Sequence, residues 1–335
     1  PRALYRIWFR LEMKLIPAFL RYFIFGSKSI HSITKSGKVE LIHARSFFPA
    51  IIGLIVKLFS VSKISLLYDN RGLWIEEGIY LGKWKRNSVK VKVFMWMENI
   101  VLKKSDYIVV VSKKFKEFLC GKSNVKIENK IQVISNNVQI QASGVKSTSR
   151  KNETTFVYTG SAAKWYSFGK LVELFLKLNL NFSNARFLIL TYETEVFQKI
   201  ILQQSNLRDK TEIKCVSSEK VYEQILHCDV GILLREENIF TSVSSPLKFA
   251  EYLNAGLPVI VNKGVGDTEE IIYKYNVGVV LDNYNYETAF KELKILLTDP
   301  GLTERCIKVA KTEFNQQVAF KQYLEVYKNI LEINE

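Results

Sequence analysis

Strand-like and helical segments alternate along almost the whole chain of 335 residues, and this alternation constrains the fold more than any other feature. Short runs rich in Val, Ile and Leu are followed by longer stretches with apolar residues at helical spacing. In the first half the strand-like runs are 39–45, 63–70, 106–112 and 130–137, the helical stretches are 49–60, 91–105 and 113–121, and a polar loop spans 71–85. Such βαβ alternation predicts an α/β fold built on parallel sheets.

A polar segment divides the chain in two. Residues 141–154 show no periodic apolar pattern, which is typical of a linker. After it the alternation resumes with six strand-like runs, and everything from 286 to the end is helical. We predict two doubly wound, Rossmann-like domains, with a cleft at the carboxyl ends of their strands. Their expected bounds are 1–145 for the first domain, 146–154 for the linker, 155–315 for the second domain and 316–335 for a helix that packs back on the first.

Charge is divided unequally between the halves. Residues 1–150 hold 27 Lys and Arg against 9 Asp and Glu, whereas the remaining residues hold 21 against 24. A basic first half predicts an anionic partner: a membrane surface, a phosphorylated substrate or nucleic acid. Residues 1–25 have basic and apolar residues at helical spacing, as in a helix at a membrane interface or an ordinary core helix. No apolar run reaches the ~20 residues of a membrane span, and no nucleic-acid-binding signature is present.

The most specific local pattern is the segment SSPLKFAEYLNAGLPVI, which begins at Ser244. We expect Ser244 or Ser245 to cap a helix and Pro246 to occupy its first turn. Lys248 and Glu251 are three residues apart and share one face near the helix start. Free amides, a lysine and a carboxylate suit a phosphate and a sugar hydroxyl; a surface Lys–Glu pair is the alternative interpretation. The chain contains no GxGxxG or GxxxxGK[ST] sequence, which disfavours dehydrogenases and P-loop enzymes.

The segment is similar to the donor-site motif of retaining, metal-independent glycosyltransferases with the GT-B fold, the large family-four group. Further similar segments occur in the expected order: DYIVVVSKKFKEFL, KIQVISNNV, FVYTGSAAKWYSFGKLVELF and VYEQILHCDVGILL. The resemblance covers most of residues 39–335. It implies a nucleotide-sugar substrate and no metal or other cofactor. In that family a strand and a glycine-bearing loop precede the first helix, so we expect the N-terminal domain to lack its first strand.

The resemblance also implies roles for individual residues in the second domain. Glu251 matches the second glutamate of the family's E-x7-E motif, which grips the donor ribose. Val243 stands where the first glutamate would fall, and Ser161 replaces the usual arginine. The donor-binding residues that the resemblance implies are Gly160, Ser161, Lys164, Thr191, Ser244, Ser245, Pro246, Lys248 and Glu251.

In the first domain, the strand at 63–70 ends in a cluster of charged residues. By resemblance, Asp69 matches the position of a His or Asp that faces the donor sugar, where a carboxylate would stabilise an oxocarbenium-like transition state. His43 is the second catalytic candidate. A simple turn with an Asp–Arg pair, and a histidine satisfied at a strand end, are the alternatives. The acceptor-binding candidates are Arg45, Arg71 and Glu76.

The function we expect is transfer of a sugar from a nucleotide-sugar to a saccharide or lipid-pyrophosphate-linked acceptor in cell-surface polysaccharide assembly, such as O-antigen or capsule. The expected location is the cytoplasm, at the inner face of the membrane, with an anionic membrane surface and no nucleic acid as partner. Two alternatives remain at this point. One is a nucleotide-sugar 2-epimerase, which shares the two-domain plan, and the other is a non-catalytic glycosyltransferase-like subunit, motivated by Val243.

Overall fold

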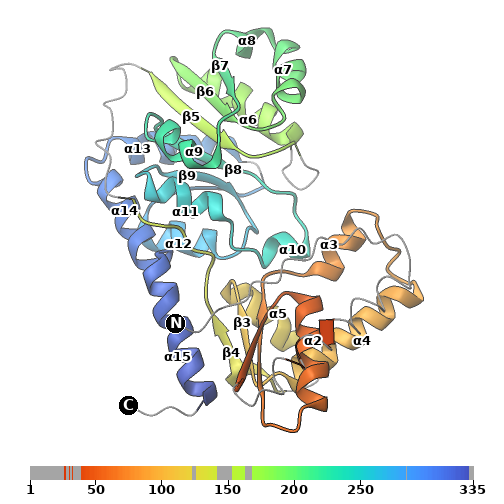
Figure 1. The fold of residues 1–335 in the computed structure, drawn as a ribbon. Helices are drawn as coiled ribbons and strands as arrows, with labels where there is room; N and C mark the ends of the chain where they lie inside the picture. Colours follow the sequence, from red (N-terminus) through yellow and green to blue (C-terminus); the bar gives the residue numbers. More distant parts are fainter. Residues whose placement is uncertain are drawn as a thin grey trace.

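The computed structural model describes residues 26–27, 30, 32, 39–122, 126–141, 153–162, 168–283 and 285–331. Three features named from the sequence lie outside these residues: the basic segment 1–25, Lys164 and most of the linker. The described residues form two parallel sheets, one in each half of the chain (Figure 1). The predicted α/β fold with two Rossmann-like domains is confirmed.

The sheet of the first half has four described strands in the order β1-β2-β3-β4, all parallel. Each strand follows a helix or loop that returns the chain to the same edge, as βαβ units require. The elements are β1 (Leu41–Arg45), α2 (Phe47–Phe59), β2 (Ser65–Asn70), α3 (Trp74–Tyr80), α4 (Val89–Lys104), β3 (Tyr107–Val110), α5 (Lys113–Lys122), the 3-10 helix η1 (Glu128–Lys130) and β4 (Ile131–Val133).

The sheet of the second half has six strands in the order β10-β9-β8-β5-β6-β7, again all parallel. Its strands and their helices are β5 (Thr154–Thr159), α6 (Phe168–Asn181), β6 (Ala185–Leu190), α7 (Thr194–Leu202), α8 (Ser205–Arg208), β7 (Thr211–Lys214), α9 (Ser218–Ile225), β8 (Val230–Leu233), α10 (Ile239–Ser242), α11 (Leu247–Asn254), β9 (Val259–Asn262), α12 (Thr268–Tyr275) and β10 (Gly278–Leu281). Three helices follow, α13 (Tyr286–Leu297), α14 (Leu302–Glu313) and α15 (Gln316–Leu331).

Helices cover both faces of the second sheet, because alternate strand residues point to opposite sides. Phe156, Phe187 and Ile232 pack with α6, α7 and α13 on one face. Val157 and Leu233 pack with α9, α11, α12 and α14 on the other. Burial on both faces explains why these strands are continuously apolar in the sequence.

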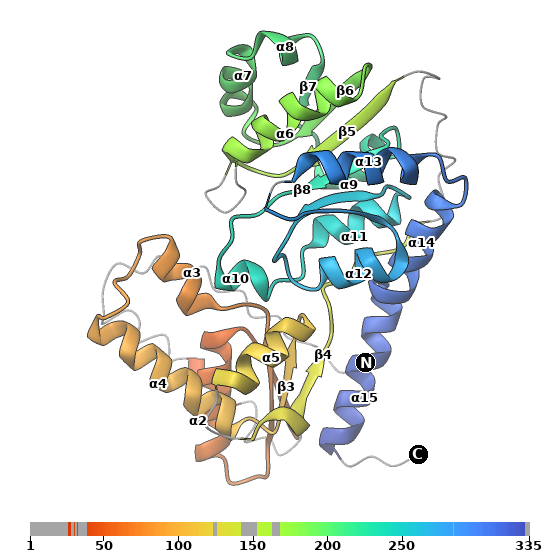
Figure 2. The ribbon, with the colours of Figure 1, turned by 180° about the vertical axis from the view of Figure 1, so that it is seen from behind.

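The first sheet is covered from two parts of the chain. One face packs on α2, α4 and α5. On the opposite face, Leu67, Val109 and Ile134 pack against Ala319 and Val326 of α15. The last helix therefore leaves the second domain and lies along the first, as Figures 1 and 2 show from opposite sides.

One sequence prediction was wrong in this half. Residues 71–85, predicted as a polar loop, contain the seven-residue helix α3. The loop prediction rested on the Trp and Glu residues that are frequent in this stretch. Leu73 and Ile75 are nevertheless buried in the core, and this burial stabilises a helix that is too short to be stable by propensity alone.

Candidate active site

The two central strands of the second sheet, β5 and β8, are neighbours, and the strand order reverses between them. Their connections leave in opposite directions and open a crevice beyond their carboxyl ends, which is where ligands bind in doubly wound sheets. Gly160 and Ser161 follow β5, and residues 235–238 follow β8. Sequence reasoning named Gly160 and Ser161 but missed 235–238. Their place directly after the buried strand VGIL was the available signal.

Tyr252 of α11 lies directly beneath this crevice. Its side chain is fully buried, and its hydroxyl accepts a hydrogen bond from the Thr159 amide at 2.8 Å. The same hydroxyl lies 2.9 Å from Thr159 Oγ1 and 3.4 Å from the Ile232 carbonyl oxygen. Gly231 makes room for the ring, because a Cβ at that position would lie 2.4 Å from it. Tyr252 thus ties α11 to the ends of both β5 and β8.

Tyr252→Phe tests this tie. The change leaves the buried Thr159 amide without its acceptor, which we expect to lower the free energy of unfolding by about 1–3 kcal/mol. Urea denaturation followed by circular dichroism measures the loss. The control is Tyr273→Phe, at a tyrosine that is 64% exposed, and its free energy of unfolding should equal that of wild type. Equal stability of the two variants would contradict the assignment.

The predicted Lys248–Glu251 pair forms on the helix that Tyr252 anchors. Lys248 Nζ lies 3.0 Å from Glu251 Oε2, and both side chains are about 30% exposed (28% and 30%). Lys248 lies one helical turn before Tyr252, and Glu251 immediately precedes it. Their position beside the switch point is therefore fixed by a buried contact, while their charged groups remain accessible to a ligand.

The helix start differs from the sequence prediction. Helix α11 begins at Leu247 with Pro246 at the N-cap and no side-chain cap, so neither serine caps it. The Ser245 hydroxyl instead accepts from the Asn136 amide at 3.1 Å, and Asn136 Nδ2 donates to the Ser245 carbonyl at 2.7 Å. Ser244 donates to the Thr241 carbonyl. The cavity beside these serines measures ≈ 10 Å³, room for one water at most. The first domain occupies the turn that was predicted to receive a diphosphate.

Val243 helps to hold the turn at Ser244 and Ser245 against the first domain. It is 1% exposed and belongs to the apolar cluster of the first domain. Its carbonyl accepts from the buried Ser112 hydroxyl at 2.7 Å. The position at which the family resemblance expects a glutamate is therefore an interdomain anchor in this chain.

A second interdomain contact lies beside the first. The Asp267 carboxylate, at the start of α12, accepts hydrogen bonds from the amides of Lys113 (2.7 Å) and Lys114 (3.2 Å). It therefore caps α5 of the other domain and complements that helix's positive end. The two domains meet through polar contacts at strand and helix ends as well as through Val243.

The loop after β6 approaches the turn after β5. Thr191 is buried, and its hydroxyl accepts from the Glu193 amide at 3.1 Å. The Glu193 carboxylate in turn accepts from the Ala162 amide. Tyr158 donates to the Ser161 carbonyl at 2.9 Å. The structure thus brings Thr191, one of the predicted donor-binding residues, and the Gly160–Ser161 turn to adjoining loops.

The two predicted catalytic residues of the first domain meet in a polar network around the buried Asp69 carboxylate. His43 Nε2 lies 3.3 Å from Asp69 Oδ2, and Arg71 Nε lies 3.0 Å from Asp69 Oδ1. Tyr323 of α15 donates to Asp69 at 3.1 Å and accepts from Arg71 at 2.8 Å. The Tyr327 hydroxyl lies 2.7 Å from His43 Nδ1. Arg71 also reaches Asn136 Oδ1 at 3.2 Å.

This network places Asp69 under α15. Its side chain is 2% exposed, so a sugar does not reach the carboxylate in this conformation. The Arg71 guanidinium, predicted to bind the acceptor, is already shared between Asp69, Tyr323 and Asn136. The geometry favours a role for these side chains in holding α15 against the first sheet.

Asp69→Asn tests that role. Burial alone raises the pKa of a carboxyl group, but the hydrogen bond from His43 and the charge of Arg71 outweigh it and hold the pKa of Asp69 below its ordinary value. Removing the charge leaves the Arg71 guanidinium, whose side chain is 17% exposed, without its counter-ion, so we expect the free energy of unfolding at pH 7 to fall by about 3 kcal/mol.

The pH dependence of this difference has a definite sign. A lowered folded-state pKa stabilises the protein above the unfolded value of about 3.9, and this contribution is lost as the pH falls through the folded-state pKa. The difference in free energy of unfolding between wild type and Asp69→Asn should therefore become smaller below about pH 4. Asp282→Asn, which removes an exposed Lys263–Asp282 pair, should match wild type at every pH; a pH-independent gap for Asp69→Asn would contradict the assignment.

The other two acceptor candidates lie apart from this network. Arg45 is exposed at the end of β1. Glu76 of α3 is mostly buried, and its carboxylate binds Arg86 at 2.5 Å and 3.3 Å. Glu76 therefore fixes the loop after α3 and has little surface left for an acceptor.

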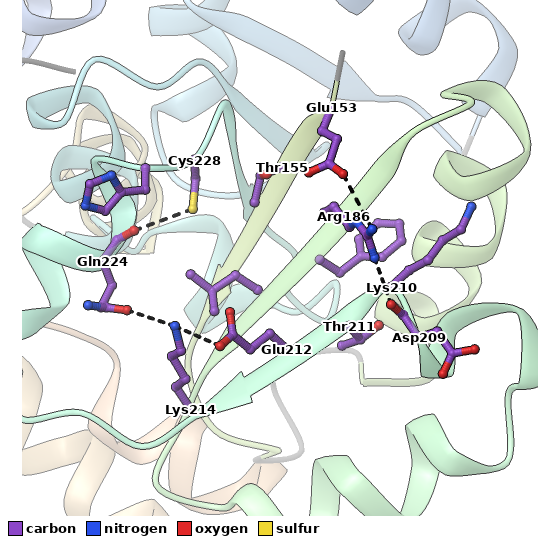
Figure 3. Close-up of a pocket in the computed structure, with 13 residues that line it drawn as sticks. Glu153, Thr155, Arg186, Asp209, Lys210, Thr211, Glu212, Lys214, Gln224 and Cys228 are labelled. Atoms are coloured by element: carbon purple, nitrogen blue, oxygen red, sulfur yellow. Dashed lines mark hydrogen bonds and ion pairs between the residues drawn. The ribbon is translucent and has the colours of Figure 1, made fainter. Parts of the chain in front are cut away.

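A groove of ≈ 580 Å³ lies elsewhere on the second domain (Figure 3). It lies at the amino-terminal ends of the strands, since Glu153 immediately precedes β5, and Thr155 and Arg186 are the second residues of β5 and β6. Its charged side chains pair with one another, as in Arg186–Glu153 (3.5 Å) and Lys214–Glu212 (2.9 Å). The groove is therefore at the opposite end of the sheet from the switch point.

The described residues contain no helix that is both long and apolar enough to cross a bilayer. They also contain no group of three His, Cys, Asp or Glu side chains placed to hold a metal ion.

Comparison with protein families decides the identity. The family model of the glycosyl transferases group 1 matches residues 139–313, just over half of the chain. The chain belongs to this family. The matched region runs from the segment before β5 into α14 and contains the switch point, Tyr252 and the Lys248–Glu251 pair. No curated protein matches by sequence.

Solved structures place this glycosyltransferase in the GT-B fold. A glycosyltransferase from Rickettsia africae is similar at TM-score 0.71 and 18% identity, with 98% of this chain and 85% of that chain covered. The lipopolysaccharide outer core galactosyltransferase WaaB is similar at 0.68 and 14%, covering 94% and 82%. HepE of Anabaena, solved in complex with UDP, is similar at 0.65 and 14%, covering 92% and 82%. At these identities the likeness concerns the fold.

Proposed function

We propose that this glycosyltransferase moves a sugar from a nucleotide-sugar donor, with retention of configuration, to a saccharide or lipid-pyrophosphate-linked acceptor. The observation that carries the proposal is the Lys248–Glu251 pair, held beside the switch point of the second sheet by the buried Tyr252. Assembly of a cell-surface polysaccharide, such as O-antigen or capsule, at the inner face of the membrane is the proposed setting. The similar fold of a lipopolysaccharide galactosyltransferase supports that setting.

The donor would lie across the carboxyl ends of β5 and β8. A carboxylate accepts hydrogen bonds from two neighbouring ribose hydroxyls, a geometry that suits Glu251. Lys248 then supplies positive charge to the diphosphate. Ser245 faces the same turn but bonds to Asn136, so a phosphate that reaches its hydroxyl must replace Asn136. Thr191, after β6, is the proposed neighbour of the nucleobase, and a similar structure with bound UDP supports a nucleotide in this fold.

In the transfer step, the bond between the anomeric carbon and the diphosphate oxygen breaks, and a bond to the acceptor oxygen forms on the same face. The acceptor proton passes to the departing diphosphate. Lysine side chains stabilise charge that develops on the leaving group; Lys248 and, by resemblance, Lys164 are the candidates.

The structure disfavours the two alternative functions that the sequence left open, a non-catalytic subunit and a nucleotide-sugar 2-epimerase. The non-catalytic hypothesis was motivated by Val243, and that residue now has an interdomain packing role. The epimerase hypothesis requires acid and base groups in the cleft, whereas His43 and Asp69 are engaged beneath α15.

A donor panel tests the proposal. The full chain is incubated with uridine, guanosine, adenosine and thymidine diphosphate sugars, and release of the nucleoside diphosphate is measured with and without a saccharide acceptor. We expect one donor class to be consumed and nuclear magnetic resonance of the product to show the anomeric configuration of the donor. Inversion, or no turnover of any donor by the full chain, would contradict it.

A further inference from the structure

Helix α4 presents an unusual outer face. Val89, Val93 and Trp96 are 77%, 45% and 64% exposed and follow one another at i, i+4 and i+7, so they form one apolar stripe. Lys92 and Lys103 lie on the same side, four residues before and seven after Trp96. We call these five residues the α4 face. Exposed large apolar side chains in a row mark an interaction surface more often than single ones do.

The charges of the whole helix have one sign at the surface. Its exposed charged residues are all lysines. Its only acid, Glu98, is buried and paired with Lys122 of α5 at 3.0 Å. The preceding loop adds exposed Lys83 and Lys85 and no acid. The partner of the α4 face must therefore be anionic.

A second apolar feature adjoins the end of this helix. Leu58, Phe59 and Val61, at the end of α2, are 62%, 75% and 103% exposed, and Lys63 follows them. Lys57 Nζ donates to the carbonyl of Lys104 at 3.3 Å, so this tip lies beside the carboxyl end of α4. Figure 2 shows α4 and α2 on the side of the first domain away from the second domain.

We propose that the α4 face, together with the 58–61 tip, docks this glycosyltransferase on an anionic lipid bilayer. A bilayer surface is anionic at its headgroups and apolar just below them, which matches lysines that flank valines and an indole ring. A nucleic acid offers phosphates but no apolar layer for the valines. The inference rests on the proposed function, because docking of the first domain would bring the cleft close to the lipid-linked acceptor of that function.

Vesicle sedimentation of the full chain tests the docking. Phosphatidylcholine vesicles with and without phosphatidylglycerol are compared at low and high salt. Wild type should bind only the anionic vesicles, and less at high salt. Lys92→Glu with Lys103→Glu should weaken binding about tenfold or more, and Trp96→Ala should weaken it severalfold even at low salt.

Matched controls separate local from total charge. Lys308→Glu with Lys311→Glu changes the net charge equally on α14, and Phe320→Ala removes an exposed aromatic on α15; both should bind vesicles like wild type. Equal weakening by the α14 pair, no effect of Trp96→Ala, or preference for RNA over anionic vesicles would overturn the proposal.

Activity distinguishes this inference from the proposed function. The α4 variants should release nucleoside diphosphate with a water-soluble acceptor at the wild-type rate. If no donor is consumed but vesicle binding depends on the α4 face, the proposed function fails and the docking surface stands. If donor is consumed but vesicle binding ignores the α4 face, the docking surface fails alone.

Discussion

Glu251→Ala is expected to lower the kcat/KM for the donor about one hundredfold. Hydrogen bonds to a charged group contribute about 1.5–3 kcal/mol each, and two bonds to ribose hydroxyls would be lost together. Each 1.36 kcal/mol corresponds to a factor of ten in rate. Because the Glu251 side chain is 30% exposed and its carboxylate pairs with Lys248 at the surface, the folded structure should survive the change. Steady-state kinetics with the donor found in the panel measures the effect.

Glu287→Ala provides the control for this variant. It removes another helical Glu–Lys pair, Glu287–Lys291 at 2.7 Å, from the exposed surface of α13. We expect its kcat/KM and its stability to equal those of wild type. If Glu251→Ala also kept wild-type kcat/KM, the ribose assignment would be wrong, and α11 would serve only to pack the sheet.

Val243→Glu is expected to destabilise the protein strongly. The substitution restores the residue that the family resemblance expects, but it places a carboxylate within the apolar cluster of the first domain, where Val243 is 1% exposed. An unpaired buried charge costs about 3–5 kcal/mol of the free energy of unfolding. Urea denaturation measures the loss, and activity should fall with it.

Ser242→Glu is the neighbouring control, since Ser242 is partly exposed at the end of α10. It should unfold at nearly the wild-type urea concentration. A Val243→Glu protein that is as stable as wild type and more active would contradict the packing role. That result would mean that residue 243 faces the donor, as the first glutamate of the motif does in the family.

The positions of the strands along the chain could be predicted from sequence because most of these strands are buried on both faces of their sheet. Parallel strands covered on both sides read as continuous apolar runs, such as VGIL in β8 and VIVN in β9. The end of α11 could also be predicted, because Gly256 follows it. This residue adopts φ +77°, a conformation that favours glycine at the end of a helix. Helix α3 was missed because its stability comes from tertiary packing rather than from its own pattern.

The site was only partly predictable, because its decisive contacts join distant parts of the chain. Tyr323 meets Asp69 across 254 residues, and Asn136 meets Ser245 across 109. Nothing in the local pattern around Asp69 indicates that α15 covers it. By contrast, Lys248 and Glu251 are three residues apart on one helix, and a local pattern suffices to place them together.

A structure of the full chain with a bound nucleoside diphosphate tests the central claim most directly. The account predicts the diphosphate beyond the ends of β5 and β8, near Lys248, with the ribose hydroxyls on the Glu251 carboxylate and the base beside Thr191. A nucleotide found in the groove of Figure 3, or anywhere that leaves Glu251 bonded to Lys248 alone, would contradict it.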